Sequence, residues 1–468
     1  MKLKLLALSV LAALTGNMAG AQEFFSWGFG APQPQPEPRV KFIYDANFDY
    51  HFDNREFSAG GNRYTNSMTI YGARLTPSIG LQVRQNANVR HKLMMGIDMM
   101  KDFGRHPSAV ATSPEYDRGL ENTRLFREIT MYYGIDAKLG SWKLLAFAGM
   151  FPRAFSEGEY SQAFFSDSLK FYDNNLEGAL IKASNSRAYM EVAFDWNGMF
   201  GSYRREQFNA FGYGRYMFCD LFSAGLAFKY HHYANTEEYG SVVDDAMVQP
   251  FVKFNFGHYC GWQDISATLG WYQSLQQDRR FKNGKSNPGG GELTLSVRNW
   301  NVGIENRLYY GRDLMPFYSM VDDGGYKYGN NLYAGSPFYR VTADGGKKWD
   351  FYDRLEVYYQ PHIADFLDLR LAITAHFPDG FRYEGMQQKL SLIFSLDKLL
   401  NPSGKSSGEG RVSGRKRSRR SSAGKSTFPL PSIRSTASPV RIGRYSVVTT
   451  VTAARIREIR TSSEYLRI

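Results

Sequence analysis

The sequence has few of the features that mark disulfide-rich proteins, helical membrane proteins or motif-bearing enzymes. It has two cysteines, Cys219 and Cys260, which excludes a disulfide-rich scaffold. Beyond residue 21 it has no apolar run near the ~18 residues of a membrane-spanning helix. It also lacks a nucleophile elbow, an H-E-x-x-H pair and a P-loop, so no contiguous motif indicates an enzyme.

A net charge is also missing from most of the chain. Residues 401–468 carry 15 Lys+Arg and 3 Asp+Glu, which accounts for the whole formal charge of +12. The remainder is neutral, so we expect no nucleic-acid partner for it. The basic segment itself is expected to be disordered, although a basic arm for nucleic acid or lipopolysaccharide phosphate, or an altered reading frame, would also explain its composition.

The N-terminus has the three parts of a secretion signal. Lys2 and Lys4 precede an apolar run over 5–14, and Ala19-Gly20-Ala21 supplies small residues for cleavage. We therefore expect a signal peptide over 1–21 and export of the remaining chain. A proline-rich periplasmic spacer over 22–38 follows, because 31–38 alternates proline with other residues.

A strict alternation begins at residue 40. Over 40–53 the sequence V-K-F-I-Y-D-A-N-F-D-Y-H-F-D places aromatic or aliphatic residues on one face and, apart from Ile43, polar residues on the other. A strand with lipid on one side and water on the other needs this period of two. The pattern predicts that Phe48 faces lipid and that Asp49 faces a lumen.

The alternation recurs along the chain and predicts an all-β fold, a transmembrane antiparallel up-and-down β-barrel of about 16 strands. Connections alternate between short ones, such as 184–187, and long ones, such as 311–347, as periplasmic turns and outer loops do. We expect the barrel over 39–397 and the basic tail over 398–468. The strand candidates are 39–53, 67–87, 92–103, 123–138, 142–152, 175–183, 188–196, 205–218, 221–234, 247–256, 264–274, 291–298, 301–310, 348–359, 367–377 and 384–397.

In this architecture the chain resembles a bacterial outer-membrane porin, over about 39–397 and without a diagnostic motif. The resemblance implies that the third outer loop, 153–174, folds into the lumen as a constriction. It also implies a final strand that closes on an aromatic residue, whereas here Phe394 lies inside the last strand and a tail follows. Candidate lumen and constriction residues are Glu157, Glu159, Asp167, Asp49, Arg74 and Arg370.

The function that this resemblance implies is a passive channel in the bacterial outer membrane for small hydrophilic solutes. We expect no cofactor, no metal and no enzymatic activity. Expected partners are the lipid bilayer and the solutes, with lipopolysaccharide and a second copy of the chain as further candidates. A structural or partner-binding barrel, and an outer-membrane hydrolase with dispersed catalytic groups, are the alternatives.

Three smaller features allow a second interpretation. Cys219 and Cys260 fall in successive periplasmic turns, where the oxidising compartment permits a disulfide. His231 and His232 could bind metal, but adjacent strand residues point to opposite faces. The loop 311–347 carries acids and amides among tyrosines and could hold Ca²⁺ or a sugar, or simply form a polar surface.

Overall fold

The computed structural model of the protein describes residues 39–58, 64–65, 67–103, 126–202, 204–341 and 348–400. The predicted signal peptide, the proline-rich spacer and the basic residues from 401 onward lie outside the described residues. Among the described residues, no helix has both the length and the apolar character needed to cross a bilayer.

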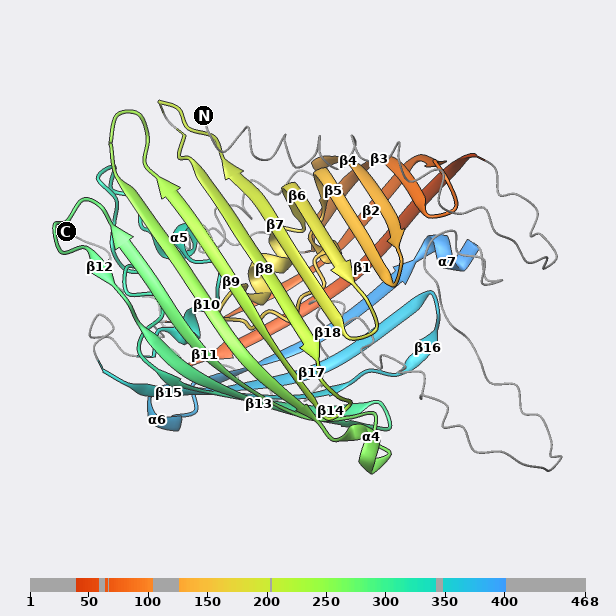
Figure 1. Ribbon diagram of the computed structural model, residues 1–468. Helices are drawn as coiled ribbons and strands as arrows, with labels where there is room; N and C mark the ends of the chain where they lie inside the picture. Colours follow the sequence, from red (N-terminus) through yellow and green to blue (C-terminus); the bar gives the residue numbers. More distant parts are fainter. Residues whose placement is uncertain are drawn as a thin grey trace, which may run out of the picture. The chain divides into compact units, whose positions relative to one another are not determined.

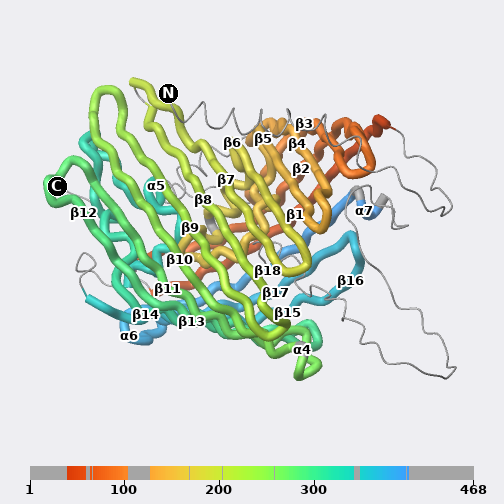
Figure 2. The backbone as a smooth tube through the Cα atoms, in the orientation of Figure 1, coloured from red at the N-terminus to blue at the C-terminus, as the bar shows by residue number. Residues whose placement is uncertain are grey.

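The described part of the chain forms one antiparallel sheet that closes on itself (Figures 1 and 2). Each long strand pairs with the next, and the last strand pairs with the first from Asn47↔Ser395 to Phe57↔Gly385. Within the described residues there are 18 strand segments, of which β12 and β16 are short additions to the wall. The long strands are β1 Val40–Phe57, β2 Met68–Arg84, β3 Val89–Asp102, β4 Phe126–Leu139, β5 Trp142–Pro152, β6 Asn175–Ser184, β7 Ala188–Gly198, β8 Gln207–Met217, β9 Phe222–Ala234, β10 Val242–Asn255, β11 Asp264–Asp278, β13 Gly289–Asn299, β14 Val302–Gly311, β15 Asp350–Tyr359, β17 Leu367–Phe377 and β18 Gly385–Ser395.

The remaining elements are short and lie in the connections. Connections alternate in length as the sequence predicts, for example 185–187 between β6 and β7 against 312–349 between β14 and β15. We take the end with long connections as the outer end, because barrels of this class place short turns in the periplasm. The short elements are η4 Arg153–Phe155, α3 Asp167–Tyr172, α4 Gly257–Cys260, β12 Lys285–Ser286, α5 Gly329–Leu332, η5 Pro337–Tyr339, β16 His362–Ala364, α6 Pro378–Phe381 and α7 Leu396–Leu400.

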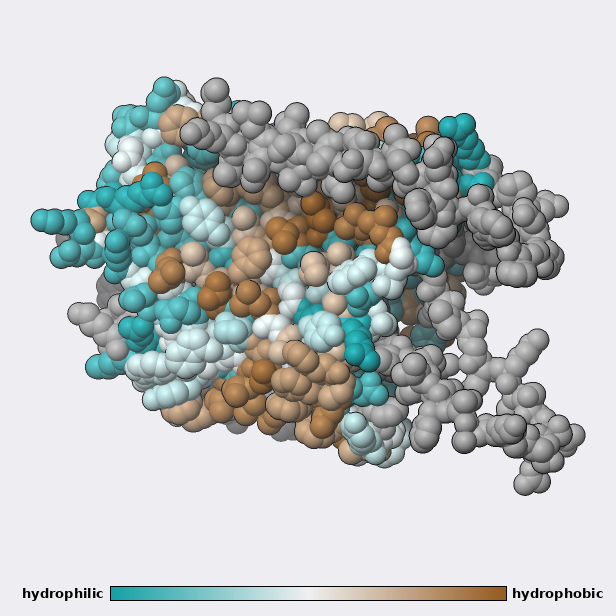
Figure 3. Space-filling model, viewed as in Figure 1, coloured by the Kyte–Doolittle hydropathy of each residue, from teal (hydrophilic) through white to brown (hydrophobic). Residues whose placement is uncertain are grey.

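Side chains alternate between an apolar outward face and a polar inward face. On β1, Phe42 and Tyr44 are 59% and 41% exposed, whereas Asp49 and Asp53 are buried inside. On the face shown in Figure 3, hydrophilic residues gather at the outer end near β12, and apolar patches lie over the middle of the wall. Because the barrel is closed, no strand edge is left with unpaired backbone N–H and C=O groups, and the apolar outward face can contact lipid. The predicted fold class, the contact with lipid and the location in the bacterial outer membrane are confirmed.

Each predicted strand position is occupied by a strand, but several boundaries differ. β1 and β11 each run four residues past their predicted ends, and the largest difference is at the start of β10. β10 begins at Val242, five residues before its predicted start, because Asp244-Asp245 resembled loop sequence. In the structure both carboxylates lie in the wall: Asp244 pairs with His232 in the ladder, and Asp245 with His231.

Two connections fold inward from the outer end. In 153–174, Phe164 and Phe165 are buried among inward side chains, and Phe155 packs on Phe147, 4.7 Å between ring centroids. This contact covers β5, the strand whose two faces are both apolar. The second inward segment is 313–341, which includes α5 and η5; the two segments are joined by a hydrogen bond from Ser166 N to Ala334 O, 2.7 Å.

Phe48→Arg is expected to impair assembly, because it places a charge on the outward face of β1. Phe48 lies beside Phe394 of β18, 6.2 Å between ring centroids, and a charge near the bilayer midplane costs about 2–4 kcal/mol. The matched control is Asp49→Asn, on the inward face, which should assemble normally. Heat-modifiable gel migration of outer-membrane fractions measures both; equal yields would show that β1 is assigned to the wrong face.

Candidate functional site

The predicted constriction residues lie inside the barrel, but each acid is paired with a base of the wall. Glu157 Oε1 lies 2.9 Å from Lys182 Nζ. Glu159 bridges two strands, with Arg215 Nη1 and Lys253 Nζ each 2.8 Å from one of its oxygens. Burial would raise the pKa of Glu159, but Lys253 and Arg215 outweigh it and lower that pKa to about 2. These pairs fasten the inward loop to the wall.

Asp167 and Arg370 belong to a second group of charges on the opposite part of the wall. Lys389 Nζ lies 3.0 Å from Asp167 Oδ2 and 3.9 Å from Glu356 Oε2. Arg370 and Arg354 each bind one oxygen of Glu356, at 2.5 and 2.6 Å. This group ties helix α3 to β15, β17 and β18.

Asp49 and Arg74 lie apart from the inward loop's acids. They face each other in the ladder between β1 and β2, and Arg74 Nε lies 3.2 Å from Asp98 Oδ1. The predicted residues therefore form three separate groups of paired charges, so the described residues do not form a single ring of one sign.

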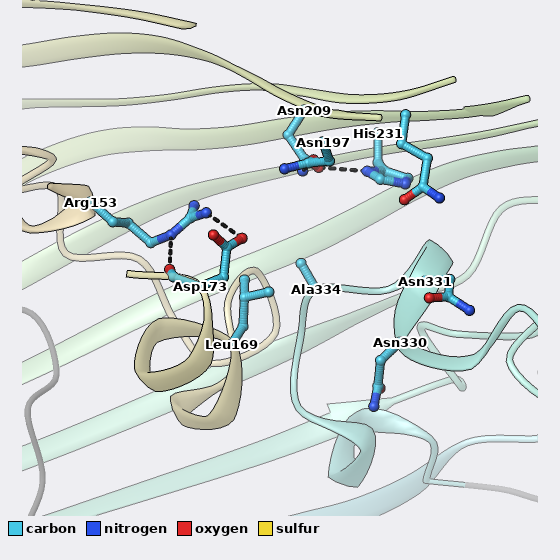
Figure 4. Close-up of a pocket in the computed structure, with 10 residues that line it drawn as sticks. Arg153, Leu169, Asp173, Asn197, Asn209, His231, Asn330, Asn331 and Ala334 are labelled. Atoms are coloured by element: carbon cyan, nitrogen blue, oxygen red, sulfur yellow. Dashed lines mark hydrogen bonds and ion pairs between the residues drawn. The ribbon is translucent and has the colours of Figure 1, made fainter. Parts of the chain in front are cut away.

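A small polar cavity of about 20 Å³ lies between the inward segments and the inner face of β8 and β9 (Figure 4). His231 Nδ1 and Asn209 Oδ1 are 2.7 Å apart on its wall side, and Arg153 Nη2 reaches Asp173 Oδ2 at 2.6 Å on the opposite side. A space of this size holds about one water molecule.

The outward face of the same strands carries a histidine–carboxylate pair. His232 Nδ1 lies 2.8 Å from Asp244 Oδ1 across β9 and β10. Tyr230 Oη donates to Asp244 Oδ1 at 2.8 Å, and Arg279 Nε and Nη2 donate to Asp244 Oδ2 at 2.9 and 2.5 Å. The carboxylate is thus held by three side chains while it orients the imidazole. We call His232, Asp244 and Arg279 the outward cluster.

The outward cluster lies at the level of the outer membrane interface. His232 is the eleventh residue of β9 from its inner end, and a transmembrane strand needs about 9–11 residues. Its imidazole stacks on Phe208, 5.0 Å between centroids, and Phe208 stacks on Trp196 at 5.7 Å. Aromatic residues of this kind form the girdle at a membrane interface. The side chains of His232 and Asp244 are 17% and 15% exposed.

The chemistry that the outward cluster can perform is general-base catalysis. Asp244 orients Nδ1 of the imidazole, which leaves Nε2 to take a proton from a substrate or a water molecule. The described ladder positions around His232 hold Phe208, Tyr230, Ala234 and Asp244. None of these carries an aliphatic hydroxyl or a thiol, so the arrangement favours water as the nucleophile.

The sequence analysis does not identify this cluster. It considers His232 only as a metal ligand with His231, and it places Asp244 in a loop although Asp244 lies in β10. Arg279 lies in the turn after β11, as the sequence predicts. The structure separates the two histidines onto opposite faces, and the described residues contain no group of three or more side chains placed to hold a metal ion. The signal that could have extended this strand is the series of apolar residues Val242, Ala246 and Val248, with a period of two that only Asp244 interrupts.

The two cysteines do not form the disulfide that their positions permit. Cys219 and Cys260 are both free and exposed. Cys219 lies in the turn between β8 and β9, and Cys260 ends helix α4 in the next turn of the periplasmic end. β9 and β10 lie between those turns, and neighbouring strands are about 4.8 Å apart. The two turns are therefore farther apart than the ~7 Å between Cα atoms that a disulfide tolerates.

Solved outer-membrane barrels resemble this chain at low sequence identity. A loop-deletion mutant of OmpT from Vibrio cholerae is 8% identical, covers 76% of this chain and 100% of its own, and has a TM-score of 0.45. OmpF of Salmonella typhi, in complex with daunomycin, is 9% identical, with 76% and 98% covered and a TM-score of 0.41. A Rh. blastica porin mutant is 11% identical, with 76% and 100% covered and a TM-score of 0.36. The fold rests on the strand pairings and not on these similarities. No curated protein matches the chain.

A family model described as "Lipid A 3'-O-deacylase-type" matches residues 42–361. The family is named for an enzyme, so the expectation that this protein has no enzymatic activity is wrong. That expectation rested on the lack of a contiguous catalytic motif in the sequence. The match spans more than half of the sequence, and the chain therefore belongs to the lipid A 3'-O-deacylase-type family.

Proposed function

We propose that the protein is an outer-membrane ester hydrolase that removes an ester-linked acyl chain from a lipid A-type glycolipid. The observation that carries the proposal is the 2.8 Å pair between His232 and Asp244 on the lipid-facing wall at the outer end. Lipid A resides in the outer leaflet, so its ester bonds reach this level of the wall without leaving the membrane.

The side chains around the pair suit an acylated, anionic glycolipid. Phe208 and Trp196 provide apolar outward surface along which an acyl chain can lie. The guanidinium of Arg279 is 54% exposed beyond its contact with Asp244, and guanidinium groups favour phosphate. The ester carbonyl of the substrate would then lie between the apolar surface and the polar rim.

In the proposed reaction, Nε2 of His232 takes a proton from a water molecule while the water oxygen attacks the acyl carbonyl carbon. The tetrahedral intermediate collapses as the bond between that carbon and the sugar oxygen breaks. The imidazolium returns its proton to the leaving sugar oxygen. The products are a fatty acid and a glycolipid with a free hydroxyl, and Asp244 stabilises the imidazolium throughout.

The passive channel for small hydrophilic solutes and the partner-binding barrel are the other functions that the sequence suggested. Two features weigh against an open pore. The segments 153–174 and 313–341 both enter the lumen, and Phe164 and Tyr339 are almost completely buried there. Assembly into a homo-oligomer stays a prediction.

The test is fatty-acid release from lipid A in mixed micelles by the purified protein, measured by mass spectrometry. We expect the wild type to release an acyl chain and His232→Gln to lose nearly all of this activity. The matched control is His91→Gln, because His91 also faces outward, beside Tyr133, but at the periplasmic end. Absence of release by the wild type would overturn the proposed function.

A further inference from the structure

The chain neighbours of the outward cluster all point into the lumen and meet in one place. Tyr233 follows His232, Val243 precedes Asp244 and Asp278 precedes Arg279. The three neighbours are 1%, 0% and 0% exposed. Tyr233 and Val243 pack in a single apolar cluster with residues of the inward segment 313–341, namely Met315, Phe317, Tyr328, Leu332 and Tyr333. The inward segment therefore lies directly behind the outward cluster.

Specific hydrogen bonds join the segment to this part of the wall. Tyr233 Oη donates to Asp322 Oδ2 at 3.1 Å. Tyr328 Oη donates to Asp278 Oδ2 at 3.1 Å, and its ring stands edge-on to Tyr233 with 5.6 Å between centroids. Asp322 thereby holds β9 through Tyr233, and Tyr328 holds β11 through Asp278. Asp322 and Tyr328 both belong to the segment 313–341.

Asp322 is itself firmly fixed. Its side chain is fully buried, Arg205 Nη2 lies 2.9 Å from Oδ2, and the backbone N–H of Tyr326 donates to Oδ1 at 2.9 Å. Asp278 is fixed in the same way by Arg280, whose Nη2 lies 2.6 Å from Oδ2. Each buried carboxylate has a guanidinium and a tyrosine hydroxyl, so neither is an uncompensated charge in the wall.

Successive residues of a strand share one backbone and point to opposite faces. A displacement of Tyr233 along or across β9 therefore displaces His232, whose imidazole must stay within hydrogen-bond reach of Asp244. A misplacement of about 1 Å in a catalytic group can cost on the order of 100-fold in rate. We propose that Tyr233 and Asp322 are positioning residues for the His232–Asp244 pair, so that the docked segment 313–341 sets the geometry of a site on the other side of the wall. This inference rests on the proposed function.

The test compares Tyr233→Phe with Tyr352→Phe in the acyl-release assay. Tyr352 is an equally buried tyrosine of β15, outside the segment 313–341, and its hydroxyl lies 2.9 Å from His376 Nδ1 in the other lumenal cluster. Tyr233→Phe is expected to lower kcat about 10- to 100-fold with KM within about twofold, because the lipid-facing surface is untouched. Tyr352→Phe should leave both values unchanged.

A second variant, Asp322→Asn, removes the charge that Arg205 and Tyr233 share, and it should reproduce the loss of kcat at unchanged KM. Equal losses for Tyr233→Phe and Tyr352→Phe, or no loss for Tyr233→Phe and Asp322→Asn, would overturn the positioning role. If His232→Gln removes activity while these two variants retain it, only this inference fails. If His232→Gln itself retains activity, the proposed function fails with it.

Discussion

His232→Gln is expected to lower kcat for acyl release by about 10²- to 10⁴-fold, the usual contribution of a positioned general base. Asp244→Asn should cause a loss of the same order. An amide can turn its NH₂ toward Nδ1, and the imidazole then carries its proton on Nε2, where a base is needed. Arg279 would also lose its two bonds to a carboxylate oxygen.

The double variant tests whether His232 and Asp244 act together as one unit or independently. Because the two side chains act as one unit, His232→Gln/Asp244→Asn should be about as slow as His232→Gln alone. Initial rates of fatty-acid release under saturating substrate give the comparison. Fully multiplicative losses would show that Asp244 acts on something other than His232.

Asp167→Asn is expected to destabilise the docked loop 153–174 by about 3–5 kcal/mol, because it removes one partner of a buried ion pair. Lys389 is 1% exposed and Asp167 is 11% exposed, with 3.0 Å between Nζ and Oδ2. Burial would raise the pKa of Asp167, but Lys389 and Arg354 outweigh it and hold that pKa below its ordinary range. The contribution of the Asp167–Lys389 pair to the free energy of unfolding is therefore complete above the pKa of an unfolded aspartate. It is lost only as the pH falls through the lower pKa that Asp167 has in the folded protein.

The measurement is denaturant unfolding in detergent micelles, together with planar-bilayer conductance. Asp167→Asn should lower the unfolding midpoint and raise the conductance, since helix α3 loses its attachment to β18. The matched control is Asp167→Asn/Lys389→Met, which removes both charges and should recover much of the stability. An unchanged midpoint and an unchanged conductance in Asp167→Asn would show that the pair does not hold the loop.

The strands were predictable because each is a local pattern. Alternation over β1 assigns Phe48 outward and Asp49 inward, and the closed sheet bears this out. The difference between an apolar outward face and a polar inward face is smaller at the outer ends of strands, because there the outward face meets the polar headgroup region. Asp244 lies at that level within β10, and so its segment resembles a loop.

The candidate site was not predictable, for a related reason. His232 and Asp244 are 12 residues apart in the sequence and become neighbours only through the register of β9 and β10. The pairing of Glu159 with Arg215 and Lys253 likewise depends on where the inward loop docks. Sequence indicated an acidic loop inside a barrel, but not that its charges are neutralised by the wall.

The most direct test of the account is the structure of lipid A in the outer membrane itself. Lipid A would be extracted from cells that produce the wild type, His232→Gln or no protein, and compared by mass spectrometry. The account predicts a species that lacks one ester-linked acyl chain with the wild type alone. Identical lipid A from all three strains, with the barrel correctly assembled, would contradict it.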